Sequence, residues 1–132
     1  MVLVKAKVVI QGSSKSCEEV AIVDTGAAVT LVDKSLAEEV GVRYLNRSVK
    51  PIVADGHEVS AALAIVDKLL VEDEELSYAH IAIVGFPDKL RERLRSLGVS
   101  EKCIIGMSTL EILGLIPNTT LGRLEKLGSL LL

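Results

Sequence analysis

Short apolar stretches separated by turn residues run through the first part of the chain, as in a β-protein. Residues 4–11 alternate apolar with polar side chains, which predicts a half-buried strand because successive strand residues point to opposite faces. The turn residues at 12–14 are followed by an unbroken apolar run at 20–23, the pattern of a strand buried on both faces. A further apolar piece at 28–32 predicts another strand.

Two hairpins are predicted in the middle of the chain. Asp55-Gly56, a dipeptide that favours a tight hairpin turn, separates two apolar segments. The acidic residues 72–75 separate two more. The four flanking segments are 48–53, 58–66, 69–71 and 76–84.

Three short helices interrupt this pattern, and each ends at a glycine. Two of them begin with a capping box, Ser35 to Glu38 and Ser108 to Glu111, and the other opens at Pro87-Asp88. The glycines that end them are Gly41, Gly114 and Gly98. A short buried strand at 103–106 and an apolar tail at 121–132 complete the pattern. The prediction is an all-β fold with two or three short helices, in a single domain over residues 1–132.

Composition and charge exclude several classes of function. The net charge is −3 and the basic residues are scattered, so no nucleic-acid partner is expected. No apolar run approaches the ~18 residues of a membrane span and no signal peptide is visible, so a cytoplasmic protein with no membrane partner is expected. Cys17 and Cys103 lack metal or disulfide spacing, and neither a metal nor a cofactor is expected. Hydrophobic residues make up 49% and aromatic residues 2%, which fits either a self-association surface or simply an aliphatic core.

Asp24-Thr25-Gly26 is the motif with the clearest chemistry. An aspartate at the end of a buried strand is costly unless its carboxylate is hydrogen-bonded or shares a proton. Gly26 would allow a sharp turn and a close approach that a Cβ would block. The motif therefore indicates either a catalytic carboxylate or an aspartate that caps a turn.

The context of this motif resembles the retropepsin-like aspartic proteases. Residues 21–27 resemble their active-site signature, and Ile104-Ile105-Gly106 before a short helix resembles their second motif. Residues 51–62 occupy the place of the family's flap hairpin. The resemblance covers roughly residues 3–127, and the leucine-striped segment 86–100 departs from it as a helical insertion.

The resemblance implies a closed acid-protease-like β-barrel protomer and an aspartic endopeptidase that acts on peptides or unfolded proteins. Because the chain has one Asp-Thr-Gly, the second carboxylate would come from a second copy, in a homodimer that pairs Asp24 with its mate. It further implies that Thr25, Gly26 and Ala27 support the active-site loop and that the Ile104-Ile105-Gly106 motif braces it. The flap residues expected to bind substrate are Ala54, Asp55, Gly56 and His57.

Other interpretations of the sequence remain. The same fold could serve as a non-catalytic dimerisation or peptide-binding module. Phosphate handling by an Asp-x-Gly hairpin would need a second such subdomain and a longer chain. His57 and His80 lack partners at catalytic spacing and are interpreted as surface or hairpin residues, and the acidic turn 72–75 as solvated rather than calcium-binding. Cys17 is expected near an exposed turn and Cys103 in the core. The sequence does not reveal the natural substrate or the pH optimum.

Overall fold

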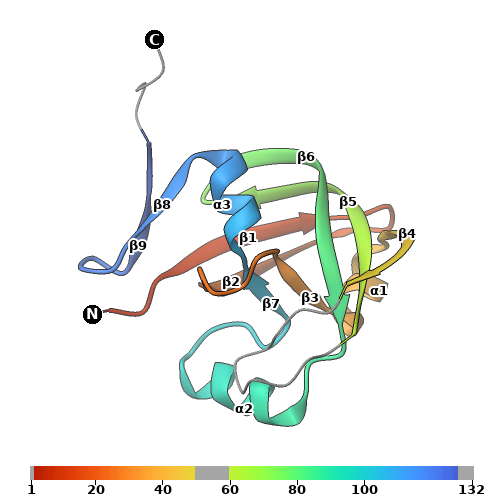
Figure 1. Ribbon diagram of the computed structural model, residues 1–132, viewed down its shortest axis with the longest axis horizontal. Helices are drawn as coiled ribbons and strands as arrows, with labels where there is room; N and C mark the ends of the chain where they lie inside the picture. Colours follow the sequence, from red (N-terminus) through yellow and green to blue (C-terminus); the bar gives the residue numbers. More distant parts are fainter. Residues whose placement is uncertain (1, 50–59, 128–132) are drawn as a thin grey trace.

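The computed structural model describes residues 2–49 and 60–127 (Figure 1). These residues form nine strands and three short helices. The strands are β1 (Lys5–Gln11), β2 (Ser16–Val23), β3 (Leu31–Asp33), β4 (Arg43–Val49), β5 (Ala61–Val71), β6 (Glu74–Val84), β7 (Cys103–Ile105), β8 (Leu115–Asn118) and β9 (Arg123–Lys126). The helices are α1 (Lys34–Val40), α2 (Asp88–Ser96) and α3 (Met107–Leu113).

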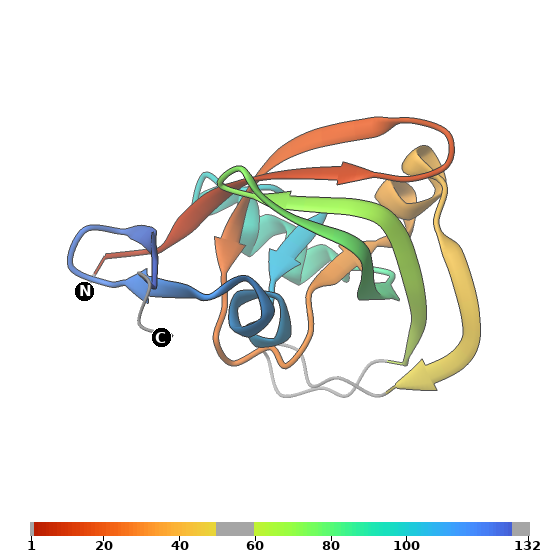
Figure 2. The same ribbon diagram turned by 90° about the horizontal axis from the view of Figure 1, so that it is seen from above.

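Six strands close into a barrel, which confirms the predicted all-β, acid-protease-like fold. Their order is β1-β2-β7-β3-β6-β5, and β5 pairs with β1 from Val8↔Val71 to Gln11↔Lys68 to close the ring. β4 pairs with β5 outside this ring, and β8 and β9 form a separate hairpin that projects from the barrel (Figures 1 and 2). Closure removes the open edges of a sheet of this size.

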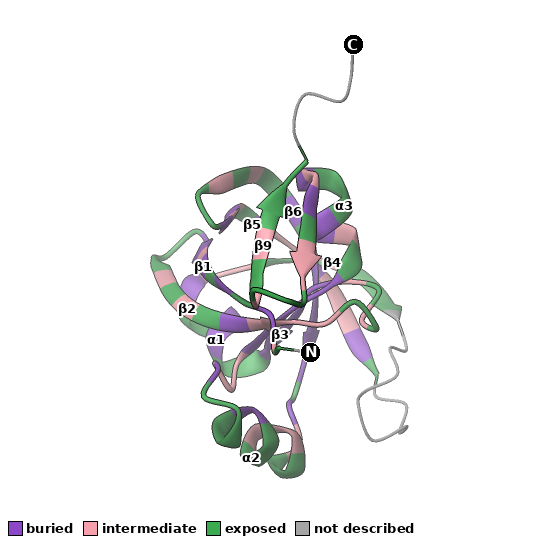
Figure 3. Cartoon of the chain, turned by 90° about the vertical axis from the view of Figure 1, so that its left-hand side faces the viewer, coloured by how far each residue is buried: buried purple, intermediate pink, exposed green. Residues whose placement is uncertain are grey.

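Where one face of a strand is exposed to solvent, its buried and exposed residues alternate as predicted. Ala6, Val8 and Ile10 of β1 are buried, and polar residues between them face outward. The buried residues line the inside of the barrel, and the outer edges and the β8–β9 hairpin are mostly exposed (Figure 3). The turn between β5 and β6 is narrower than predicted, since only Glu72 and Asp73 lie between the strands, both with positive φ.

Three strand predictions need correction. The run 20–23 belongs to a longer β2 and is not buried on both faces, because Val20 is 47% exposed. Within 28–32 only Leu31 and Val32 are in a strand, since the residues before them form the loop that follows β2. β4 begins five residues before the predicted start at 48, and β8 was not predicted.

Cys17 lies in β2 and packs on the core rather than in a turn.

α1 and α3 end one residue before the predicted Gly41 and Gly114, and α2 ends two residues before Gly98. The starts of α1 and α3 differ from the prediction. α1 is capped by Asp33, whose carboxylate accepts a hydrogen bond from the Ser35 N–H, so Ser35 is not the cap. α3 begins directly after Gly106, and Ser108 lies inside its first turn. The N–H groups of Met107 and Ser108 donate to Ala27 and Ala28 of the loop after β2, which replaces a side-chain cap.

Asp33 also fixes the start of α2. Its buried carboxylate accepts hydrogen bonds from the Phe86 N–H at 2.8 Å and from Arg91 at 3.2 and 3.3 Å, in addition to those from Ser35. Burial opposes ionisation of Asp33, but the hydrogen bonds from Ser35 and Phe86 and the charge of Arg91 outweigh it and hold the pKa of Asp33 below its ordinary value. One carboxylate thus joins α1, the end of β6 and α2.

We predict that Asp33→Asn lowers the free energy of unfolding by about 1–3 kcal/mol at pH 7, because it removes the charge that satisfies buried donors. The depressed pKa stabilises the fold above about pH 4, and this contribution is lost as the pH falls through the folded-state pKa. Urea unfolding at pH 7 and pH 3, at one protein concentration, would show the deficit of the variant shrinking in acid. The exposed Asp67→Asn is the control, and an equal deficit at both pH values would contradict the assignment.

Candidate active site

Asp24 begins the loop that leaves the end of β2. Its backbone N–H donates to Ile105 of β7 at 2.9 Å, and its carbonyl accepts from the Ala27 N–H at 3.1 Å. β7 pairs in parallel with β2, from Ile22↔Ile104 to Val23↔Ile105. The backbone of Asp24 is therefore held from two sides, and the residue sits where the chain turns away from the sheet.

The Asp24 carboxylate is partly exposed and folds back on its own loop. Its Oδ1 accepts a hydrogen bond from the Gly26 N–H at 2.9 Å. A Cβ at Gly26 would lie 3.1 Å from the same oxygen, closer than an ordinary contact, so glycine allows this approach. Gly26 does not have a positive φ, so the predicted sharp turn does not depend on left-handed backbone geometry. The hydroxyl of Thr25, which is exposed, makes no hydrogen bond with any described residue.

The segment from β7 to α3 packs directly against this loop and supports it. Gly106 lies so close to Val29 that a Cβ on Gly106 would be 2.2 Å from the carbonyl carbon and oxygen of Val29. Directly after it, Met107 and Ser108 donate to Ala27 and Ala28 at 2.8 and 3.0 Å. The structure thus brings the two predicted motifs, around Asp24 and around Gly106, into direct contact.

Two buried threonines that sequence reasoning missed complete the support. The Thr30 hydroxyl accepts from the Gly106 N–H at 3.1 Å and lies 2.7 Å from the hydroxyl of Thr109. The Thr30 carbonyl also accepts from the Ala82 N–H at 3.0 Å. A polar residue inside the apolar segment 28–32 was the available signal, because a buried hydroxyl needs a hydrogen-bond partner. The sequence could not show that its partner lies in α3.

A pocket of about 360 Å³ opens beside Asp24. Its floor comes from apolar residues of β2, β3 and β7, and one wall comes from α2. The predicted residues Asp24, Ala27 and Ile104 line it, whereas Ile105 is buried in the barrel core. Sequence reasoning did not connect α2 with this pocket. The lining residues are Leu3, Ile22, Val23, Asp24, Ala27, Leu31, Leu90, Arg93, Leu94, Leu97 and Ile104.

The predicted flap lies outside the described residues. Ala54, Asp55, Gly56 and His57 all fall within 50–59. What the structure does describe are the two strands that flank this segment, β4 and β5, which pair from Val49↔Ala61 onward.

A comparison with known families identifies the chain. The sequence profile described as aspartyl protease matches residues 6–109, from β1 into α3. The chain belongs to this aspartyl protease family. The family is of retropepsin type, as the resemblance of the two motifs implied. The matched residues include both the Asp24 loop and the Gly106 segment. A search of curated proteins found no significant match.

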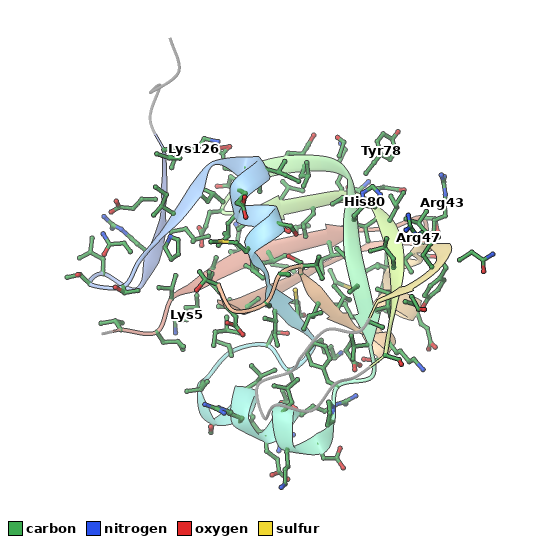
Figure 4. The ribbon with its side chains drawn as sticks, in the orientation of Figure 1. Lys5, Arg43, Arg47, Tyr78, His80 and Lys126 are labelled. Carbon is green, nitrogen blue, oxygen red and sulfur yellow. The ribbon has the colours of Figure 1, made fainter. Side chains whose placement is uncertain are left out.

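Rival chemistries find little support elsewhere in this aspartyl protease family member. Burial raises the pKa of Cys103 to about 12 and also raises that of Cys17, which opposes formation of a nucleophilic thiolate. His80 is exposed on the outside of β6, near Arg43 (Figure 4). Within residues 2–49 and 60–127 no cluster of acidic, histidine or cysteine side chains is arranged to hold a metal ion. Among the same residues no helix is long and apolar enough to cross a membrane.

We predict that Gly106→Ala lowers the free energy of unfolding by at least about 2 kcal/mol, because the new methyl group overlaps the Val29 backbone. Gly85→Ala is the matched control, since a Cβ there has no heavy atom within 4 Å and should change stability by under about 0.5 kcal/mol. Chemical denaturation of the two variants and the wild type compares them. Equal stability of the two variants would show that the loop and the β7–α3 segment do not constrain each other.

Proposed function

We propose that the chain is an aspartic endopeptidase whose catalytic carboxylate is Asp24. The observation that carries the proposal is the Asp24 loop itself: a partly exposed carboxylate at the edge of an apolar pocket, braced by the Gly106 segment. Membership of the aspartyl protease family supports a protease-type activity. The loop geometry supports Asp24 as the residue that performs it.

Two copies of the chain are needed for this chemistry. Aspartic proteases use two carboxyl groups roughly 3 Å apart that share one proton. The chain has one Asp-Thr-Gly, so the second carboxyl group would be the Asp24 of a second copy across a two-fold axis. In the protomer the Thr25 side chain is exposed and has no described partner, which leaves it available to bond across that axis.

Peptide hydrolysis then proceeds by general acid–base catalysis. The ionised Asp24 accepts a proton from a water molecule as the water oxygen bonds to the peptide carbonyl carbon. The protonated Asp24 of the other copy donates its proton to the carbonyl oxygen. In the collapse that follows, a hydroxyl proton passes to the second carboxylate, the C–N bond breaks, and the leaving nitrogen takes the proton held by the first. The pair returns to one ionised and one protonated carboxyl group.

The remaining predicted residues take supporting roles in this proposal. Gly26 and Ala27 form the floor beneath the substrate, and Ile104, Ile105 and Gly106 hold the loop in place. Ala54, Asp55, Gly56 and His57 form the flap tip that closes over a bound peptide and excludes water. Residues 1–132 act as one domain, with the flap hairpin at about 51–62 and the helical insertion at about 86–100.

An apolar surface at one end of the protomer supports self-association. α3 and the β8–β9 hairpin expose large apolar side chains that surround a hollow of about 380 Å³. Met107 belongs to this apolar surface, and its N–H is hydrogen-bonded to the Asp24 loop. A second copy that packed on the surface would therefore lie beside the loop. We define the end patch as the exposed apolar residues that line this hollow, Met107, Ile116 and Leu127.

A non-catalytic dimerisation or peptide-binding module is the alternative. It would use the same pocket and the same end patch without turnover. The two functions differ in whether a peptide bond is cut, so cleavage decides between them.

We predict that Asp24→Asn lowers kcat/KM for an unfolded protein or peptide library by at least about 10³-fold between pH 3 and 8, because it removes both general acid and general base. A shared pair makes a further prediction for mixed dimers. When wild type and variant are mixed equally and allowed to exchange, about one quarter of the dimers hold two Asp24 residues. Activity should therefore fall to about one quarter of that of wild type at the same total concentration.

The controls for this experiment are the folded state and the dimeric state of both proteins, checked by circular dichroism and sedimentation. Activity of about one half in the mixture would mean that each copy acts alone. Equal cutting by the wild type and the variant would place the activity outside Asp24. A folded wild-type dimer that cuts no peptide at any pH would contradict the endopeptidase and support the non-catalytic binding module.

We predict that Ile116→Asp converts the dimer to monomers and abolishes cleavage, because it places a charge in the proposed interface. Ile116 is 47% exposed and lies in β8, outside the barrel, so the change leaves the barrel intact. Tyr78→Asp is the control on β6, with an exposure of 68% (Figure 4). Sedimentation velocity and the peptide assay measure both variants, and a dimeric, active Ile116→Asp protein would contradict the end patch as the interface.

A further inference from the structure

α2 contributes one continuous face to the pocket beside Asp24. The pocket-lining residues Leu90, Arg93, Leu94 and Leu97 follow the i, i+3, i+4, i+7 spacing of a single helix face. Leu94 is buried in an apolar cluster with Ile104, and Leu97 is 41% exposed at the edge of the pocket. The leucine stripe is therefore partly core and partly pocket wall.

This wall is held at both ends. The Asp33 carboxylate binds Arg91 and the Phe86 N–H at the start of α2. After the helix, the Ser100 N–H donates to Val20 of β2 at 2.7 Å, and Arg95 forms a two-point ion pair with Glu101. The face toward Asp24 is thus fixed before a substrate arrives, which limits the entropy lost on binding.

Arg93 differs from the other two arginines of the helix. Arg91 and Arg95 are each paired with a carboxylate, and neither lines the pocket. Arg93 lines the pocket, and no carboxylate among the described residues lies within ion-pair distance of it. An otherwise apolar wall therefore carries one cation whose partner is not supplied by the described part of the protomer.

We propose that α2 selects the substrate, and that Arg93 binds an acidic side chain of the peptide. This inference rests on the proposed function of the site. The peptide class is one with a large aliphatic residue in the pocket and a glutamate or aspartate on the same side of the chain. Side chains of an extended peptide alternate between faces, so the two residues are two positions apart. The leucines of α2 contact the first, and the guanidinium pairs with the second.

The test measures peptide binding, so that it does not depend on turnover. The probes are fluorescent peptides that differ only in one residue two positions before or after a leucine: glutamate, glutamine or lysine. Their affinity for the Asp24→Asn protein is read by fluorescence anisotropy, and cleavage of the same peptides by the wild type is followed in parallel. The variants added to the Asp24→Asn background are Arg93→Gln, Arg93→Glu and, as a control on the same helix, Lys89→Gln, because Lys89 is exposed and does not line the pocket.

We expect the glutamate peptide to bind about threefold to fivefold more tightly than the glutamine peptide, with the lysine peptide weakest. The preference should disappear in Arg93→Gln, invert in Arg93→Glu, persist in Lys89→Gln and weaken in high salt. Inversion is the decisive result, because loss of structure cannot create a preference for lysine.

Three other results have separate meanings. An unchanged order of affinities in Arg93→Glu, or no order in the parent protein, would overturn the inference while cleavage by the wild type upholds the proposed function. The expected order without any cleavage would overturn the endopeptidase and support α2 as the selecting wall of a binding module. Failure of every peptide to bind would overturn the inference as well.

Discussion

The structure depends on one close passage of the backbone, in which the end of β7 runs directly beneath the loop that joins β2 to β3. β7 pairs in parallel with β2 and antiparallel with β3, so two consecutive strands are held apart by a third. The loop between them must cross over β7, and it crosses where Gly106 leaves no room for a side chain against Val29. This crossing sets the position of Asp24, because the residue follows β2 and donates to the β7 backbone. The barrel and the candidate catalytic carboxylate therefore have a common origin.

A second constraint is the buried carboxylate of Asp33, which fixes the position of α2 just as the crossing fixes the position of Asp24. A buried charge is tolerated only when donors surround it. Those of Asp33 come from three separate segments: the start of α1, Phe86 between β6 and α2, and α2 itself. Because each donor needs the others in place to keep the charge satisfied, the position of α2 is tied to the barrel. The wall of the pocket is thus held by these polar contacts together with the apolar packing of Leu94, and its floor by apolar packing.

The parts of the fold that could be predicted from the sequence are those governed by local physics. The alternation in β1 indicated its buried face, and glycines indicated where α1 and α3 end. The role of Ile104-Ile105-Gly106 as a support of the Asp24 loop came instead from the family resemblance, and the structure brings the two segments into contact. The wrong predictions concern positions whose burial or hydrogen bonding depends on residues distant in the sequence. Val20 is apolar yet 47% exposed, because burial depends on which distant segments pack on β2 and not on the local pattern. Ser108 fitted a capping box, but backbone carbonyls of the Asp24 loop accept the hydrogen bonds of that helix start. The hydroxyls of Thr30 and Thr109 are hydrogen-bonded although the residues are 79 positions apart, and no local pattern can indicate such a contact.

The arrangement separates the chemistry of the site from its selectivity. The Asp24 loop is braced by β7 and α3, and none of those hydrogen bonds involves α2. The pocket wall, in contrast, is one face of α2, which is attached through Asp33, Val20 and Glu101. Substitutions on the pocket face of α2 can therefore change the shape and charge of the pocket without moving the carboxylate beside it.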